Sequence, residues 1–121
     1  MKANITVYFF IMGIFSLNSC KDSGFDNNVV VNKKVNLKVW GNCEMCKETI
    51  ETSLKVKGVK EADWNKDTKI ITIAFDSTKI SLDQIEKNVA TVGYDNEKYR
   101  GDDGAYNNLP ECCQYERKIP D

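Results

Sequence analysis

The sequence contains no histidine, and this absence removes whole classes of chemistry. Ser-His-Asp triads, Cys-His nucleophile pairs, Cys₂His₂ zinc fingers and histidine-based metal sites all need an imidazole. Any chemistry must therefore come from cysteine, carboxylate, lysine or tyrosine side chains. The sequence also lacks an excess of positive charge, since 17 Lys and Arg stand against 18 Asp and Glu. The resulting net charge of −1 disfavours nucleic acid as a partner.

The longest apolar run is too short to cross a bilayer. A transmembrane helix needs about 20 apolar residues, whereas the apolar stretch here covers residues 7–17. Lys2 is the only charged residue before Cys20, so this stretch has the layout of a secretory signal. It ends in Leu17-Asn18-Ser19-Cys20, which resembles a bacterial lipobox and implies cleavage before Cys20 and lipid attachment to it. The alternative is a plain secreted protein in which Cys20 is a spare thiol.

These features predict a simple domain organisation. Residues 1–19 would be a lipoprotein signal peptide, and residues 20–33, rich in Asp and Asn, a flexible tether. Residues 34–100 would form one domain, and residues 101–121 a cysteine-containing tail too loop-like for another element. We therefore expect an extracytoplasmic protein, lipid-anchored to a bacterial membrane on its periplasmic side or at the cell surface.

Hydrophobic patterns divide the domain into alternating strands and helices. Alternation over residues 35–39 predicts a strand, and an apolar stripe of Cys46, Ile50 and Leu54 predicts a helix over residues 47–57 that Gly58 terminates. Residues 59–64 and 69–75 then form a β-hairpin around a polar turn.

A second helix and a weak strand complete the domain. Ser81-Leu82-Asp83-Gln84 has the Ser-x-x-Gln form of a capping box, and the apolar spacing that follows runs to Val92, with Gly93 as the stop. Residues 94–100 are short and polar and predict only an edge strand.

The order β-α-β-β-α-β is that of the ferredoxin-like α+β sandwich. In this fold a four-stranded antiparallel sheet carries two helices on one face. A domain of this size buries only about 60% of the surface of its unfolded chain, so we expect modest stability without ligand. The expected core consists of Leu37, Val39, Ile50, Leu54, Ile71, Ile73, Ile85 and Val89.

A Cys-x-x-Cys pair stands between the first strand and the first helix. Cys43 and Cys46 are spaced so that both sulfurs can reach one metal ion, and the helix N-terminus favours thiolate over thiol. Two thiolates without other obvious donors suit soft ions that accept two sulfurs, whereas structural Zn(II) normally takes four protein ligands. We therefore predict Cu(I), with Ag(I), Hg(II), Zn(II) and Cd(II) as alternatives.

Several short motifs together resemble the heavy-metal-associated domain of bacterial copper chaperones, metal-transporting P-type ATPases and periplasmic mercury-binding proteins. They are Trp40-Gly41-Asn42-Cys43-Glu44-Met45-Cys46-Lys47, Ile50, Leu54, Gly58-Val59 and Gly93-Tyr94-Asp95. The resemblance covers residues 34–100 and implies a ferredoxin-like fold, with Cys43 and Cys46 as metal ligands and Tyr94 packed beside the metal. The family usually shows Gly-Met-x-Cys-x-x-Cys, but here only Asn42 separates Gly41 from Cys43.

Three further sulfur-bearing residues allow more than one interpretation. Met45 is a candidate thioether ligand, although an exposed or packing methionine is the preferred interpretation. Cys112 and Cys113 in the tail would either add one or two thiolates to the Cys43/Cys46 site or pair in disulfides. An inert tail is the third alternative.

Two classes of function remain open. The first is a protein that binds a soft metal ion and carries, buffers or transfers it without catalysis. It would exchange the ion with a donor or acceptor protein such as a metal-transporting ATPase or an efflux component. The second is a thiol-disulfide redox protein that uses Cys43 and Cys46. A thioredoxin-like enzyme usually has a proline facing its disulfide, but Pro110 and Pro120 both lie in the tail, which favours the first class.

Overall fold

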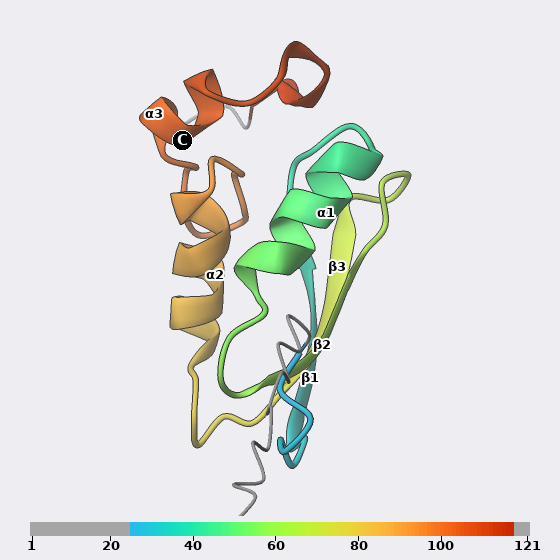
Figure 1. Ribbon diagram of the computed structural model, residues 1–121, viewed down its shortest axis with the longest axis vertical. Helices are drawn as coiled ribbons and strands as arrows, with labels where there is room; N and C mark the ends of the chain where they lie inside the picture. The colour runs from blue at the N-terminus through green and yellow to red at the C-terminus, as the bar shows by residue number, and fades with distance from the viewer. Residues whose placement is uncertain (1–24, 118–121) are drawn as a thin grey trace, which may run out of the picture.

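A three-stranded antiparallel sheet forms the centre of the structure. The computed structural model describes residues 25–117, so Cys20 and the predicted signal peptide lie outside the described residues. The strands are β1 (Lys33–Lys38), β2 (Val59–Trp64) and β3 (Ile70–Phe75), in the spatial order β1-β3-β2. Helices α1 (Glu44–Ser53) and α2 (Leu82–Thr91) lie next to each other, and α1 packs against β2 (Figure 1). The α+β class predicted from the sequence is confirmed.

The sheet buries one face and exposes the other. Ile71, Ile73 and Phe75 of β3 are fully buried, as alternation along a strand requires. On the opposite face the Thr72 hydroxyl donates a hydrogen bond to Asn36 Oδ1 (2.9 Å); Asn36 is exposed and Thr72 half-buried. All eight expected core residues are buried. The core also holds side chains that the expectation omitted, chiefly Val59, Trp64, Phe75 and Tyr94.

Both helices have the predicted buried stripes, but α1 ends early. Cys46, Ile50 and Leu54 are fully buried along α1, whose last turn closes at Ser53. Gly58 lies in the following turn with φ +98° and donates its N–H to Asp26 Oδ2 (3.4 Å). At α2 the Ser81 hydroxyl accepts from the Gln84 N–H (3.1 Å), as the capping box predicts. Within residues 25–117 no helix combines the length and apolar character needed to span a membrane.

The predicted fourth strand does not form. Residues 94–100 contribute a single antiparallel bridge between Val39 and Asn96, at the edge of the sheet next to β1. Asn96 turns the chain back on itself, because its Oδ1 accepts from the N–H groups of Lys98 and Tyr99 (3.0 and 2.9 Å). Its amide also donates to Glu86 O (2.8 Å). These local bonds replace the ladder that a strand would make with β1.

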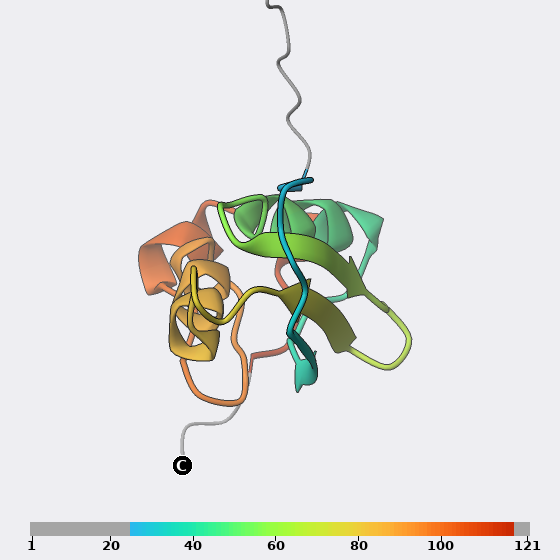
Figure 2. The same cartoon turned by 90° about the horizontal axis from the view of Figure 1, so that it is seen from below.

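The tail is not loop throughout, and the prediction of no further element there was wrong. Helix α3 (Asp103–Asn107) and the 3₁₀ turn η1 (Glu111–Cys113) follow the domain. The Asp102 carboxylate caps α3 by accepting from the Ala105 N–H (2.8 Å), a local signal that the loop-rich composition obscured. Figure 1 shows both elements across the end of the molecule where α1 begins, and Figure 2, seen from below, shows α3 beside α2.

Candidate metal centre

Cys43 and Cys46 lie at the N-terminus of α1. Cys43 is the N-cap residue in an extended conformation, and Cys46 is in the first turn. Their Sγ atoms are 3.5 Å apart, with Cys43 half-buried and Cys46 fully buried. Burial opposes ionisation of Cys43, but hydrogen bonds from Cys46 and Cys113 hold the pKa of the Cys43 thiol below its usual value. Cys43 is therefore the thiol of this pair that is both accessible and disposed to ionise.

The loop before Cys43 follows the ring of Trp64 closely. A Cβ added at Gly41 would lie 2.9 Å from Trp64 Cζ2 and 3.3 Å from Cys46 Cβ. The indole N–H donates to Val39 O (3.0 Å), which fixes the ring under the loop. Only glycine fits at position 41, and this close packing sets the direction in which the chain enters the cysteine pair.

Asn42 holds the Cys46 thiol. Its Oδ1 accepts from Cys46 Sγ at 3.0 Å, and its backbone N–H points at the same sulfur at 3.5 Å. The exposed Asn42 therefore contacts the site through Cys46. The backbone N–H is a fixed donor, so it can also donate a hydrogen bond to Cys46 when that residue is a thiolate.

Tyr94 lies beneath the cysteines. Its side chain is fully buried, and its hydroxyl has no hydrogen-bond partner within residues 25–117. Burial raises the pKa of the Tyr94 hydroxyl far above its usual value, and the neighbouring thiols of Cys46 and Cys113 raise it further. The hydroxyl thus stays protonated and keeps a hydrogen available for a sulfur that becomes a thiolate.

The structure brings both tail cysteines to the same place. Cys113 Sγ is 3.6 Å from Cys43 Sγ and 3.8 Å from Cys112 Sγ, and the three sulfurs lie within 4.8 Å of one another. Cys113 is 1% exposed, whereas Cys112 is at the surface. Met45, 50% exposed, places its Sδ 3.5 Å from Cys112 Sγ. All four described cysteines are free thiols.

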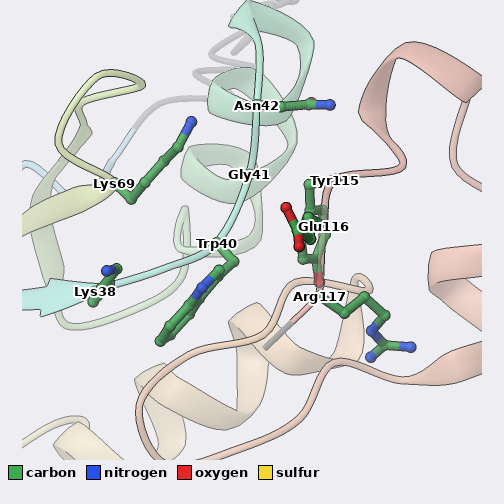
Figure 3. A pocket seen from close by; sticks show the side chains of 8 residues that line it. All are labelled: Lys38, Trp40, Gly41, Asn42, Lys69, Tyr115, Glu116 and Arg117. Carbon is green, nitrogen blue, oxygen red and sulfur yellow. The ribbon is translucent and has the colours of Figure 1, made fainter. Parts of the chain in front are cut away.

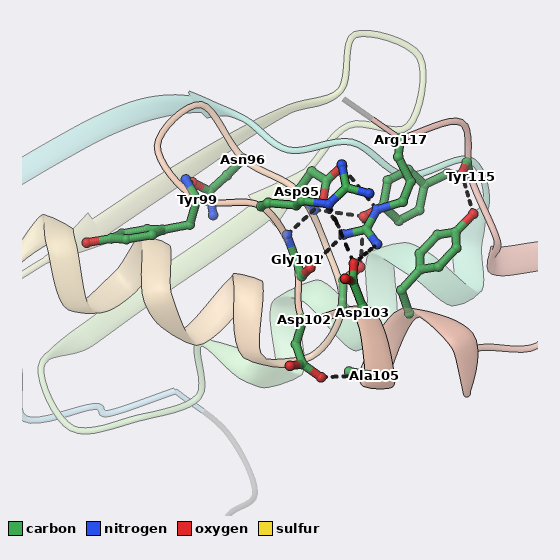
Figure 4. Close-up of polar contacts among 12 residues, drawn as sticks. Asp95, Asn96, Tyr99, Gly101, Asp102, Asp103, Ala105, Tyr115 and Arg117 are labelled. Carbon is green, nitrogen blue, oxygen red and sulfur yellow. Dashed lines mark hydrogen bonds and ion pairs between the residues drawn. The ribbon is translucent and has the colours of Figure 1, made fainter. Parts of the chain in front are cut away.

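A polar cluster around Asp95 attaches the tail to the domain (Figure 4). The Tyr115 hydroxyl accepts from the Asp95 N–H (2.8 Å) and donates to Gly93 O (2.7 Å). Arg117 Nη2 lies 2.8 Å from Asp95 Oδ1, and the guanidinium covers the ring of Tyr106 at 4.5 Å. Sequence analysis missed this cluster, because nothing in the local pattern links residues 115–117 to Asp95.

Backbone packing tightens the same attachment. Gly93 has φ +97°, and a Cβ added at Gly101 would lie 2.6 Å from the Gly93 carbonyl carbon. The Tyr115 ring stacks on Tyr94 with centroids 5.4 Å apart. The tail is therefore packed directly onto the loop that carries Tyr94, and this packing holds Cys112 and Cys113 next to Cys43.

Two open pockets flank the cysteine loop. One lies between residues 38–42 and residues 115–117, with Lys69 beside it, and has no cysteine in its lining (Figure 3). The other is lined by Cys43, Met45 and Cys112 together with Lys66 and neighbouring polar residues. The second pocket gives an ion or a partner thiol access to the sulfurs from solvent.

The donor set fits a soft metal ion. Metal–sulfur bonds of about 2.3 Å place the sulfurs around one ion about 3.7–4.6 Å apart, depending on coordination number. The observed separations of 3.5–3.8 Å between neighbouring sulfurs lie at or just below the short end of this range, which corresponds to four sulfurs around the ion. An ion held linearly by Cys43 and Cys46 alone would require their sulfurs to move apart by about 1 Å. Thiolates select Cu(I) and other soft ions over hard cations. The arrangement can therefore bind such an ion and exchange it by replacement of thiolates.

Comparison with known proteins identifies a family and several relatives. Residues 42–95 match the family described as the heavy-metal-associated domain. The copper chaperone CopZ of Staphylococcus haemolyticus is 27% identical over 67 residues, which are 54% of this chain and 97% of CopZ. Among solved structures, a CopZ metallochaperone is 29% identical with a TM-score of 0.51, covering 53% of this chain and 98% of that one. Oxidized MerP from Ralstonia metallidurans CH34 is 31% identical with a TM-score of 0.51, covering 54% of this chain and 93% of that one.

The family match covers the Cys-x-x-Cys pair and Tyr94 but stops before α3, so Cys112 and Cys113 lie outside it. The family match and the similar folds agree with the resemblance found in the sequence. Through residues 42–95, this chain belongs to the heavy-metal-associated domain family.

Proposed function

We propose that this protein binds Cu(I) through Cys43 and Cys46 and carries, buffers or transfers it outside the cytoplasm. The observation that carries the proposal is the pair of sulfurs 3.5 Å apart at the start of α1, one half-buried and one fully buried. Likeness to a protein named as a copper chaperone supports the choice of ion. Ag(I), Hg(II), Zn(II) and Cd(II) are the competing ions.

Each residue of the site has a distinct task in this proposal. Cys43 faces the open pocket, so it would meet an incoming ion or a partner's thiolate first. Cys46, held by Asn42, is the inner ligand. Tyr94 keeps its hydroxyl proton and can donate to the sulfur that becomes charged in a buried place. Binding releases thiol protons, so the affinity should fall at low pH.

We also propose a location and a class of partner. The lipobox-like Leu17-Asn18-Ser19-Cys20 supports a lipid anchor and an extracytoplasmic location. The partner would be a metal donor or acceptor with its own exposed thiolates, such as a metal-transporting ATPase or an efflux component. No chemical step beyond ligand exchange is needed, so the protein would act as a carrier rather than an enzyme.

A competition titration tests the function. Reduced protein is titrated with Cu(I) and with Zn(II) against chelators of known affinity, and we expect Cu(I) to be held far more tightly. The Cys43→Ser/Cys46→Ser variant should lose this tight binding, whereas Thr52→Ser, at an exposed position in the last turn of α1, should keep it. Unchanged Cu(I) affinity in the double variant would refute the proposal.

A further inference from the structure

Two of the four clustered thiols have no assigned role. The family match ends at residue 95, yet the tail carries Cys112 and Cys113 back to Cys43. We propose that Cys43, Cys112 and Cys113 form a second, three-sulfur site for a soft metal ion, overlapping the Cys43/Cys46 pair at Cys43. This inference rests on the proposed function, because it concerns the same class of cargo.

The three sulfurs are close enough to share an ion. Cys43 Sγ is 3.6 Å from Cys113 Sγ, Cys113 Sγ is 3.8 Å from Cys112 Sγ, and all three lie within 4.8 Å. Three sulfurs around one ion at about 2.3 Å would be about 4 Å apart. Cys43 is also 3.5 Å from Cys46, so it is the one thiol common to both ligand sets.

The tail is built to hold this position. Cys113 is 1% exposed, and its N–H donates to Pro110 O (2.8 Å) within η1. Two residues later the Tyr115 ring stacks on Tyr94, and its hydroxyl joins Asp95 to Gly93. Arg117 adds an ion pair with the buried Asp95 carboxylate. Ligands fixed in this way lose little conformational freedom when an ion binds.

The surroundings favour a soft ion over a hard one. Met45 adds a thioether sulfur 3.5 Å from Cys112 Sγ. Glu44 and Glu111 are each adjacent in sequence to one of these cysteines, and both are exposed. Glu44 lies 3.5 Å from the Lys66 ammonium. Among residues 25–117, no carboxylate joins the three sulfurs in the group within 4.8 Å. The ligands gathered at the three-sulfur site are therefore thiolates, with a thioether at the rim, and such donors select Cu(I) and similar ions.

The overlap gives the cargo a path from solvent to interior. Cys112 is exposed, Cys43 is half-buried, and Cys113 and Cys46 are buried. An ion taken up through Cys112 could pass to the inner pair by exchanging Cys112 and Cys113 for Cys46 while Cys43 stays bound. The chain would thus supply thiolates that a two-cysteine carrier has to obtain from its partner.

The test isolates the second site by removing Cys46. Reduced Cys46→Ser protein is titrated with Cu(I) against a chelator, and the number of bound sulfurs is measured by X-ray absorption. We expect one Cu(I) bound by three sulfurs. Adding Cys112→Ser and Cys113→Ala should weaken binding by at least about a hundredfold, since ligand loss costs more than loss of a supporting residue. Alanine at 113 keeps the buried position apolar, and far-UV circular dichroism of the metal-free variants verifies folding.

Two comparisons separate this inference from the proposed function. An affinity of Cys46→Ser protein that does not depend on Cys112 and Cys113, or a two-sulfur spectrum, overturns the three-sulfur site. Failure of the Cys112→Ser/Cys113→Ala protein to bind Cu(I) through its intact Cys43/Cys46 pair refutes the proposed function instead. Thr52→Ser, at an exposed position in the last turn of α1, serves as the control and should leave affinity and sulfur number unchanged.

Discussion

Glu86 is an ionisable residue in a buried position. It lies on α2 with 8% of its surface exposed, and its Oε2 has no hydrogen-bond partner within residues 25–117. Burial raises the pKa of the Glu86 carboxyl, with Asp83 and Glu97 adding to the rise and Lys98 opposing it. A raised pKa means that the folded state prefers the protonated acid, so ionisation at neutral pH costs stability.

Replacing this carboxylate should therefore stabilise the protein. We expect Glu86→Gln to raise the free energy of unfolding by about 1 kcal/mol at pH 7, because the amide is buried without a charge. The gain should shrink as the pH falls through the folded-state pKa and vanish below the unfolded value of about 4.3. Urea denaturation at pH 7 and pH 3.5 measures it.

Glu48→Gln is the control, since Glu48 is an exposed residue of α1 and should change stability little. A destabilised Glu86→Gln protein, or a gain that is equally large at pH 3.5, would contradict this account.

At the scale of elements, the C-terminal segment depends on one hydroxyl. The Tyr115 hydroxyl satisfies the N–H of Asp95 and the carbonyl of Gly93, both buried. Tyr115→Phe leaves those two backbone groups without this partner, which costs about 1–3 kcal/mol of stability. The change should also raise hydrogen exchange in residues 102–117 and lower the fraction of molecules with Cys113 next to Cys43.

Hydrogen exchange with mass spectrometry measures this loosening. Tyr106→Phe is the matched control: its half-buried hydroxyl makes one bond, to Tyr115 O (2.7 Å), so its loss should cost less. Equal exchange of residues 102–117 in Tyr115→Phe and the parent protein would show that the hydroxyl does not hold the tail.

Element prediction succeeded where local pattern and tertiary packing agree. The stripe of Cys46 and Ile50 and the Ser81 cap are signals carried within a few residues, and both appear in the structure. The fourth strand failed because Asn96 bonds to its own neighbours, Lys98 and Tyr99, instead of continuing a ladder.

The site shows the same division between local and distant signals. Cys43, Cys46 and Asn42 are adjacent in sequence, so their meeting follows from one loop and one helix turn. The approach of Cys113 to Cys43 depends on Tyr115 and Arg117 recognising residues about twenty positions earlier. Such contacts between segments leave no periodic trace in a sequence, which is why the role of the tail cysteines stayed open.

At the scale of the whole molecule, a bound ion would act as a cross-link. Cys43 and Cys113 are separated by 70 positions, and we expect the small core to leave the metal-free protein with modest stability. If the folded state alone binds the ion, free Cu(I) at a hundred times the dissociation constant should add about 2.7 kcal/mol to the free energy of unfolding. Each further tenfold increase should add about 1.4 kcal/mol.

Thermal unfolding in chelator-buffered Cu(I) tests this coupling. The midpoint should rise with free Cu(I) in the reduced protein and stay constant in a variant with serine at positions 43, 46 and 112 and alanine at 113. An unchanged midpoint at saturating Cu(I) would mean that the ion binds folded and unfolded chains alike.

The position of α1 also decides which way the sulfurs face. Asp26, near the first described residue, bonds to Gly58 just beyond the C-terminal end of α1, whereas Cys43 caps its N-terminal end. Ten helical residues at about 1.5 Å each separate these two ends by about 15 Å. If the chain is tethered at Cys20, as proposed, the thiols project from the pole distal to the tether. A partner would then reach the thiols from the aqueous side, without having to enter the space between the protein and the lipid surface.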